Sequence, residues 1–594
     1  MLIDKARLAH ADLRHRRLQV ASERLGIVIK GLTVATGLAA VAIVAALALS
    51  ASGDRGLVIE SFAVPPDLVQ TGLTGEVAAG RLLDKLAAMQ AATDSQRAPD
   101  SYANNWGADL KVEIPSTGVS IGELQRFLRD WLGHRTRISG DIVRTPAGLA
   151  ITTRVGTQPG RMVVGPEADL DALNQRAAEA IFAGAQPYRY GIWLVQRGRQ
   201  AEAVDHFRRM AALAATPADR AWAQVGLANT LASLNDTRAA LAAARASLGE
   251  LPGFAPGLGQ LSNAETILGH DEAAYGVNRR WLVALRRGDA PITARASASQ
   301  SAQLQALNAQ AVGDFSKARA AQARLAALPD YNGASTYAPY IAPIYQAGQH
   351  ELTGARASAE ALPIHGAYDQ ASRDYALLMI ADAAGDGPAA LALADRNLAD
   401  SLALGTAGSI FDLTTLIPVK ALAMARSGDT AGALALIGTT PLDCSLCLRN
   451  RARIAAIAGD HAGADRWFAE AVRQTPSLPF ALADWARALL DRGDLAGALA
   501  KARQANDLAP RFAEPLEIWA EALLRQGQFA PAEARLRAAA GLAPRWGRNQ
   551  LMWGEALARL GKPDQAHARW LAARGMDLSL DDRARLERLL AGRR

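Results

Sequence analysis

A short repeat near the end of the chain is the feature that most constrains its fold. Glycine, alanine, tryptophan and proline all recur there at one fixed interval. The series are Gly459, Gly493, Gly527 and Gly561; Ala464, Ala498, Ala532 and Ala566; Ala471, Ala505, Ala539 and Ala573; Trp485, Trp519 and Trp553; and Pro476, Pro510 and Pro544. Interleaved series with one period predict a stack of similar units that bury a continuous core between neighbours.

Each residue type in the series has a physical task in a helix-turn-helix unit. Glycine suits the tight turn, alanine lets paired helices approach closely, tryptophan fills the core between repeats, and proline ends the second helix. The pattern resembles the tetratricopeptide repeat, whose period of about 34 residues it shares. Position 8 of that motif, usually glycine, is occupied by Ala452, Ala486, Ala520 and Gly554. We therefore expect four regular repeats over 443–578 and a C-terminal capping helix over 579–594.

The same phase continues upstream with irregular spacing. Turn signals stand at Gly198-Arg199-Gln200, Asn235-Asp236, Gly269-His270, Gly313-Asp314, Gly348-Gln349, Gly385-Asp386 and Gly428-Asp429. Alanine makes up about a fifth of the chain and aromatic residues only 5%, which favours closely packed helices over sheets. The sequence thus predicts degenerate helical hairpins over 186–442 and a mostly α fold, an α-solenoid in the form of a superhelix.

A small mixed domain is expected before the repeats, over 56–182. Strands are predicted at 56–64 and 110–114 and in ISGDIVRTPAGLAITTRV and RMVVG, with helices at 74–89, 121–132 and 169–182. The stretch VIESFAV…GLTGEVAAGRLLDKL, with LRDWLG and ISGDIVRTPAGLAITTRV after it, resembles TolB amino-terminal-like domains. That resemblance implies a role in assembly and protein contact. A folded spacer is the alternative.

The positive charge is concentrated before an apolar segment. Residues 1–30 carry +4 of the formal net charge of +7, and the segment from Gly31 to Gly53 includes no charged side chain. In a helix that rises about 1.5 Å per residue this segment spans a bilayer, and the positive-inside rule places the basic leader in the cytoplasm. We expect a single transmembrane anchor at 31–53. A signal peptide cleaved near Ser50-Ala51-Ser52, or a buried soluble helix, is the alternative.

The resemblance to tetratricopeptide repeats implies that the first helix of each pair lines a concave face that binds proteins or extended peptides. Carried over by position, this predicted binding face comprises Arg449, Arg453, Arg487, Asp491, Glu517, Glu521, Arg525, Arg548, Glu555 and Arg559. The mixed charges indicate neither a strongly acidic nor a strongly basic ligand. The alternative is an ordinary solvated surface with ion pairs between positions i and i+4.

Catalytic and cofactor motifs are not found in the sequence. Cys444 and Cys447 form CSLC, for which a disulfide, a reduced buried pair and a redox site are the alternatives. A zinc site would need further ligands, and no HExxH, phosphate-binding glycine loop or GxSxG elbow occurs. We therefore expect no enzyme activity, no cofactor and no metal. Because the charge beyond the leader is nearly balanced, nucleic acid is not an expected partner either.

Together these features predict a scaffold in the bacterial inner membrane. Its N-terminus would lie in the cytoplasm, and its mixed domain and repeats would lie in the periplasm and recruit envelope proteins. The alternative is a sensory or regulatory subunit that relays a periplasmic signal through the single span to a cytoplasmic partner. The sequence indicates neither the identity of the partner nor the oligomeric state.

Overall fold

The computed structural model describes residues 57–98, 101, 110–112, 136–156, 160–288 and 291–591, with the single positions 38 and 42. The leader, the apolar segment at 31–53 and the helix expected at 121–132 lie outside these segments. No helix within them is long and apolar enough to cross a membrane. The described residues divide into two compact units. The first includes those before Gln96 and those from Ser101 to Trp193, and the second includes Gln96–Ala98 and those from Leu194 onward.

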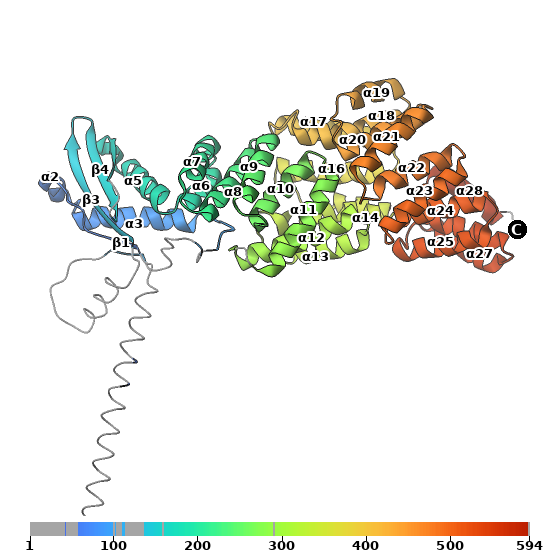
Figure 1. Ribbon diagram of the computed structural model, residues 1–594, viewed down its shortest axis with the longest axis horizontal. Helices are drawn as coiled ribbons and strands as arrows, with labels where there is room; N and C mark the ends of the chain where they lie inside the picture. Colours follow the sequence, from blue (N-terminus) through green and yellow to red (C-terminus); the bar gives the residue numbers. More distant parts are fainter. Residues whose placement is uncertain are drawn as a thin grey trace, which may run out of the picture. The chain divides into compact units, whose positions relative to one another are not determined.

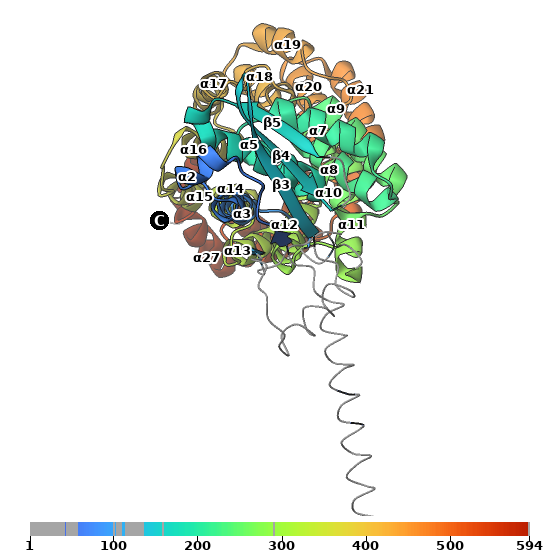
Figure 2. The same ribbon diagram turned by 90° about the vertical axis from the view of Figure 1, so that its left-hand side faces the viewer.

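The first unit contains a five-stranded mixed sheet (Figures 1 and 2). Its strands, in the spatial order β2-β1-β3-β4-β5, are β1 (Leu57–Ile59), β2 (Leu110–Val112), β3 (Thr136–Thr145), β4 (Gly148–Val155) and β5 (Arg161–Gly165). β1 runs parallel to β2 and β3, and the β3-β4 and β4-β5 pairs are antiparallel. β3 and β4 coincide with the strand pair expected around Pro146-Ala147-Gly148.

Helices α3 (Gly75–Ala91) and α5 (Leu170–Ala185) pack together and against this sheet. The short elements α2 (Pro66–Gln70) and η2 (Glu167–Asp169) complete the unit, and α6 (Pro187–Gln196) lies at its boundary. The core of the unit is formed by fully buried aliphatic and aromatic side chains, among them Leu57, Ile59, Leu82, Leu86, Ile138, Ile151 and Phe182. The described residues of the expected mixed domain therefore form one sheet with a core against α3 and α5.

The first strand is shorter than the sequence predicts. Glu60 still donates its amide to the carbonyl of Ile138, but Phe62 donates its amide to Gly75 at the start of α3, 3.2 Å away. Regular pairing with β3 is therefore interrupted after Ile59 and returns only as a bridge between Ala63 and Asp141. Pro66 then begins helix α2, where the sequence predicts only the end of a strand.

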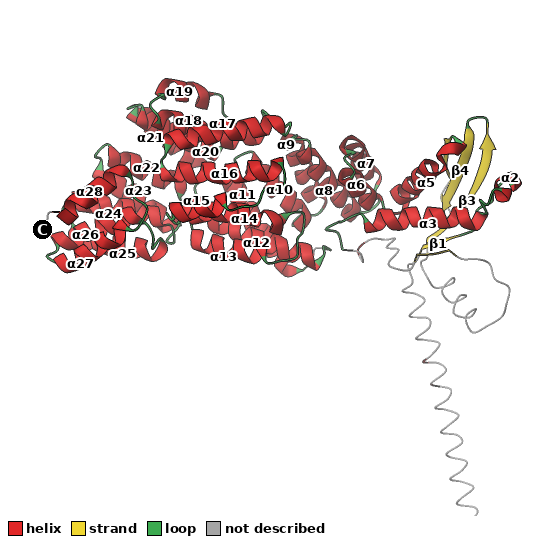
Figure 3. Cartoon of the chain, turned by 180° about the vertical axis from the view of Figure 1, so that it is seen from behind, coloured by secondary structure: helices red, strands yellow, loops and turns green. Residues whose placement is uncertain are grey.

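The second unit is a succession of antiparallel helical hairpins (Figures 1 and 3). After α7 (Gln200–Leu213), its helices are α8 (Pro217–Ser233), α9 (Thr237–Glu250), α10 (Ala255–Ile267), α11 (Asp271–Arg287), α12 (Ala294–Ala311), α13 (Phe315–Ala326), α14 (Ala334–Gly348), α15 (Leu352–Glu360), α16 (Ala367–Ala384), α17 (Gly387–Ala403), η3 (Asp412–Leu416), α18 (Ile417–Arg426), α19 (Thr430–Gly438), α20 (Ser445–Ile457), α21 (His461–Gln474), α22 (Phe480–Asp491), α23 (Leu495–Leu508), α24 (Ala513–Arg525), α25 (Phe529–Leu542), α26 (Gly547–Arg559), α27 (Pro563–Arg574) and α28 (Leu580–Ala591). The prediction of a mostly helical solenoid with a small sheet before it is confirmed.

The turns between paired helices explain the glycine series. Gly459, Gly493, Gly527 and Gly561 all have φ between 71° and 89°, a left-handed conformation that side chains disfavour. The following aspartate often begins the next helix: Asp460, for example, accepts the amide of Gly463 at 2.8 Å. Each of the seven upstream turn signals also lies between two paired helices. The glycine-aspartate pair therefore ends one helix and caps the next.

The alanine and tryptophan series have different surroundings. The alanines of both series are at most 1% exposed, as close helix packing requires. Trp553 is also buried, but Trp485 and Trp519 are only half-buried. A cation from the second helix of the same repeat covers each ring: Lys501, Arg535 and Arg569 lie 3.9, 3.8 and 3.6 Å from the three centroids. The tryptophans therefore lie at the edge of the core with a cation over each ring, whereas the sequence predicts that they fill the core.

The absence of a side chain at Gly554 makes room for Trp570. A Cβ atom at this position would collide with Nε1 of Trp570, whose indole donates to the carbonyl of Leu551. The facing positions in the preceding repeats hold the smaller Leu536, Ala502 and Phe468. Glycine is therefore retained in the one regular repeat that packs a tryptophan at this point.

Repeats that are far apart in the sequence contact each other along one line of the array, which we call the seam. Here the turns before α11, α13 and α15 contact residues 164–224 positions later in the chain. The contacts include Ser445 with Gly269, Glu272 with Ser477, Asp314 with Arg511, Phe315 with Phe512, His350 with Glu514 and Trp546, and Thr353 with Asp577. Such contacts are unusual for a repeat array, in which each unit normally contacts only its neighbours.

Candidate interaction surface

Cys444 and Cys447 lie at the start of α20 and are joined by a disulfide with an S–S distance of 2.06 Å. Both are fully buried, and Cys444 packs against Gly269 of the seam. Ser445 next to it donates its amide to the carbonyl of Gly269 at 2.9 Å. The disulfide therefore stabilises the point where the first regular repeat meets an earlier turn, and its burial separates it from any substrate.

The central residues of the predicted binding face form what we call the buried charge network. It comprises Arg487 on α22, Glu517 and Glu521 on α24, Arg548 on α26 and Asp582 on α28. Arg548 binds both glutamates at 2.9 Å and Asp582 at 3.1 Å. Arg487 binds Glu521 at 2.9 Å and also pairs with Glu517. Four successive inner helices are thus connected by charge.

The carboxylates of these ion pairs are largely shielded from solvent. The side chain of Glu517 is fully buried and that of Glu521 is 9% exposed, while the two arginines remain about one-third exposed. Burial alone would raise the pKa of Glu521, but Arg487 and Arg548 outweigh it and lower that pKa to about 2. The glutamates raise the pKa of Arg548 against the opposing effect of burial. Glu521 and the two arginines therefore stabilise each other's charged forms.

Other residues of the predicted face also have partners within the array. Arg449 binds Asp484 at 2.7 Å and covers the ring of Phe480, and Arg453 donates to Asn450. Glu555 binds Arg585 at 2.6 Å, and burial raises its pKa despite that arginine. The Arg449–Asp484 and Glu555–Arg585 pairs connect successive first helices and are half-buried. These ion pairs hold successive repeats together.

The exposed part of the predicted face is a narrow stripe at the ends of the first helices. Asp491, Arg525 and Arg559 are exposed and occupy one repeat position. Ile457 holds the same position in the repeat before Asp491 and is 47% exposed. We call these four residues the exposed stripe. Arg525 reaches back to Glu521 and to the carbonyl of Leu490, and Arg559 covers Phe529, so both arginines are oriented by the array.

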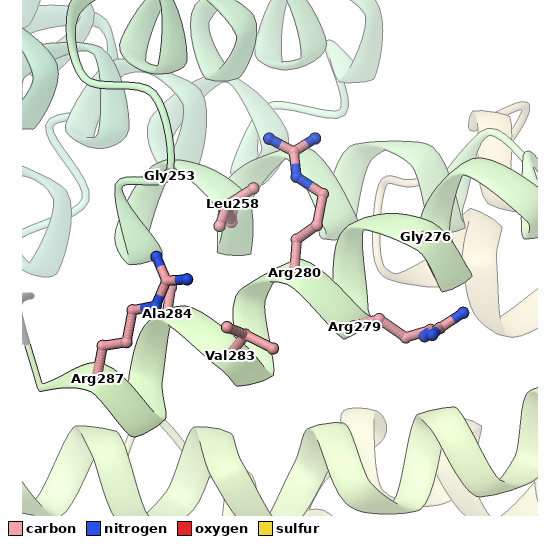
Figure 4. A pocket seen from close by; sticks show the side chains of 8 residues that line it. All are labelled: Gly253, Leu258, Gly276, Arg279, Arg280, Val283, Ala284 and Arg287. Carbon is pink, nitrogen blue, oxygen red and sulfur yellow. The ribbon is translucent and has the colours of Figure 1, made fainter.

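A second surface feature, which sequence reasoning missed, is a groove beside α11 (Figure 4). We call it the α11 groove. Its volume is 540 Å³, and it is lined by Gly253, Leu258, Gly276, Arg279, Arg280, Val283, Ala284 and Arg287. The signal that could have revealed it is charge: Ala273–Gly288 contains four arginines and no acidic residue.

The described residues provide no metal site. No group of three or more histidine, cysteine, aspartate or glutamate side chains in these segments could hold a metal ion. The strongest carboxylate cluster is the buried charge network, in which arginines already occupy the carboxylate oxygens.

Comparisons with known proteins give no family. No family model and no curated protein matches the chain. Among solved structures, yeast Tom70 is 13% identical, with 68% of this chain and 94% of that chain covered and a TM-score of 0.32. MamA of AMB-1 is 14% identical over 28% of this chain and 98% of that chain, with a TM-score of 0.23. The Cut9-Hcn1 hetero-tetramer of APC/C matches at 13% identity over 72% and 88%, with a TM-score of 0.30. Likenesses this low say nothing about what the chain binds.

Proposed function

We propose that this chain is a membrane-anchored scaffold of the bacterial cell envelope. The apolar segment at 31–53 anchors it in the inner membrane, with the basic leader in the cytoplasm. The mixed domain and the helical array lie in the periplasm, where the array binds other proteins or extended peptides. It needs no cofactor for this role.

The observation that carries the proposal is the continuous array with its exposed stripe. Stacked hairpins present an extended surface on which one residue position recurs at regular intervals, and such surfaces suit extended partners. Ile457, Asp491, Arg525 and Arg559 supply an apolar, an acidic and two basic contacts in order. The stripe therefore favours a partner of mixed composition.

Two further features support a location outside the cytoplasm. Disulfides persist in oxidising compartments such as the periplasm, and the described cysteines are both bonded. The charge asymmetry around residues 31–53 favours the same orientation. The resemblance to TolB amino-terminal-like domains fits a position in the envelope.

A reporter fusion tests the proposed topology. Alkaline phosphatase fused after Arg594 is expected to be active in cells, because it would be exported with the array and form its own disulfides. A matched fusion after Lys30 is expected to be inactive. A cytosolic reporter that is active when fused after Arg594, where the phosphatase is inactive, would contradict the proposed topology.

A further inference from the structure

The α11 groove combines an apolar floor with a rim of guanidinium groups. Val283 and Ala284 of α11 form the floor beside Leu258 of α10, which is only 1% exposed. Figure 4 shows Arg280 and Arg287 extending from α11 toward the segment that carries Gly253 and Leu258, with Arg279 directed along the helix. Both the volume of 540 Å³ and the open rim suit side chains that project from a partner.

The arginines of α11 differ from the arginines that take part in the half-buried ion pairs of the array. Arg487, Arg548, Arg449 and Arg426 are each paired with a carboxylate. Arg280, Arg286 and Arg287 are exposed and pair with no carboxylate of the described residues, and Arg279 contacts only the ring of Tyr275, at 5.7 Å. The groove therefore has a local excess of positive charge that the described part of the chain does not neutralise.

Helix stability does not account for all four charges. Arg286 and Arg287 lie in the last turn of α11, where cations interact favourably with the helix dipole. Arg279 and Arg280 lie about two turns earlier, beyond the reach of this effect. Their exposure instead leaves both guanidinium groups available to an external anion.

Glycine keeps the groove open. A Cβ atom added at Gly276 would meet nothing within 4 Å, so packing does not require glycine there, whereas Gly253 has a φ of 88° that itself favours glycine. Gly276 lies in the interior of α11, where glycine is less favourable than alanine. Side chains absent from both positions leave space beside Val283 and Leu258.

We propose that the α11 groove binds an acidic peptide segment of a partner protein. Its carboxylates would pair with Arg280 and Arg287, whose planar guanidinium groups suit two-point recognition of carboxylates. An apolar side chain of the segment would lie on Leu258, Val283 and Ala284. The recessed apolar floor favours a peptide over a nucleic acid, because the groove lining includes no aromatic ring on which a base could stack.

This inference deepens the proposed scaffold function and rests on it only for the assumption that the array binds proteins. The groove is lined mainly by α11, the second helix of its hairpin, with Leu258 of the first helix, whereas the exposed stripe lies at the ends of first helices in later repeats. It is therefore a separate surface, and the two can bind different parts of one partner or two partners.

The test is fluorescence anisotropy with the purified full-length chain in detergent micelles and a short dye-labelled peptide of alternating glutamate and leucine. We expect saturable binding that weakens with added salt. Arg280→Glu with Arg287→Glu should weaken it at least about tenfold, since two charge-assisted hydrogen-bond sites are reversed. Gly276→Leu should weaken it by a similar factor without changing charge, because leucine fills the opening and favours helix.

The matched control is Arg583→Glu with Arg588→Glu on α28, which makes the same change of net charge at two exposed arginines. This control should leave peptide binding unchanged. Equal weakening by the control, no effect of Gly276→Leu, or competition by single-stranded DNA as strong as by unlabelled peptide would each overturn the proposal. Because the assay uses purified protein, an inactive phosphatase fusion would contradict the proposed topology but not this inference. Loss of peptide binding would contradict this inference but not the topology.

Discussion

Replacing Glu521 with glutamine is expected to lower the free energy of unfolding of the regular repeats by about 3 to 5 kcal/mol. Its carboxylate accepts hydrogen bonds from Arg487 and Arg548 at 2.9 Å and from Arg525 at 2.5 Å. The neutral amide retains the volume of the side chain but removes one of the three carboxylates that compensate Arg487 and Arg548. Urea unfolding followed by tryptophan fluorescence measures the effect, since Trp485, Trp519 and Trp553 lie in these repeats.

Glu587→Gln is the control for this substitution. Glu587 pairs with Arg574 at 3.2 Å, but its side chain is 49% exposed. Exposed ion pairs contribute little, so we expect a change of at most about 0.5 kcal/mol. Equal effects of Glu521→Gln and Glu587→Gln would contradict a cohesive role for the buried charge network.

The same network gives the repeats a pH dependence of known sign. The pKa of Glu521 is lowered from 4.5 to about 2, so the folded state favours the ionised carboxylate. Its contribution to stability is complete above the ordinary pKa and is lost as the pH falls from about 4.5 toward 2. Because glutamine does not titrate, the difference in stability between the native chain and Glu521→Gln should shrink over this range.

Phe512→Ala is expected to have the second large effect, a loss of about 3 to 5 kcal/mol. Phe512 is 3% exposed and packs against Phe480 and Phe315, whose ring centroids lie 5.2 and 6.3 Å away. It also covers Gly313, where an added Cβ atom would lie 2.5 Å from its ring. The substitution therefore leaves a cavity at the seam.

Hydrogen exchange distinguishes opening of the seam from a general loss of stability. We expect faster exchange in Phe512→Ala at the turn before α13, which is distant from Phe512 in the sequence but contacts it across the seam. Leu508→Ala is the control, because Leu508 on α23 is 38% exposed and should change stability by well under half as much. Unchanged exchange at 312–315 would show that the seam does not hold those turns.

The repeat architecture was predictable because its determinants are local. A left-handed glycine at the turn is a property of a few adjacent residues, and at several turns an aspartate follows it and caps the next helix, as Asp460 and Asp494 do. The same holds for β3 and β4, whose alternating residues surround a short turn. The interruption after Ile59 was not predictable, since it depends on Gly75, which accepts the amide of Phe62.

The surroundings of the predicted binding face depended on contacts between repeats. Arg487 and Glu521 are 34 residues apart, as are Arg548 and Asp582. Opposite charges at one repeat position in successive repeats were therefore a sequence signal for pairing between repeats. The seam is harder to predict: Cys444, Phe512 and Trp546 share one repeat position, but nothing at that position identifies the distant turn, 164–224 residues away in the seam, that each residue contacts.

Photo-crosslinking in intact cells tests most directly whether the array is an extracytoplasmic scaffold. A photoreactive amino acid in place of Arg525 on the exposed stripe should give a discrete adduct with a membrane or periplasmic protein. The same amino acid at Leu571, which is 51% exposed on α27 and outside the stripe, should not give that adduct. No adduct above the Leu571 control, or an adduct only with cytosolic proteins, would contradict the proposed function.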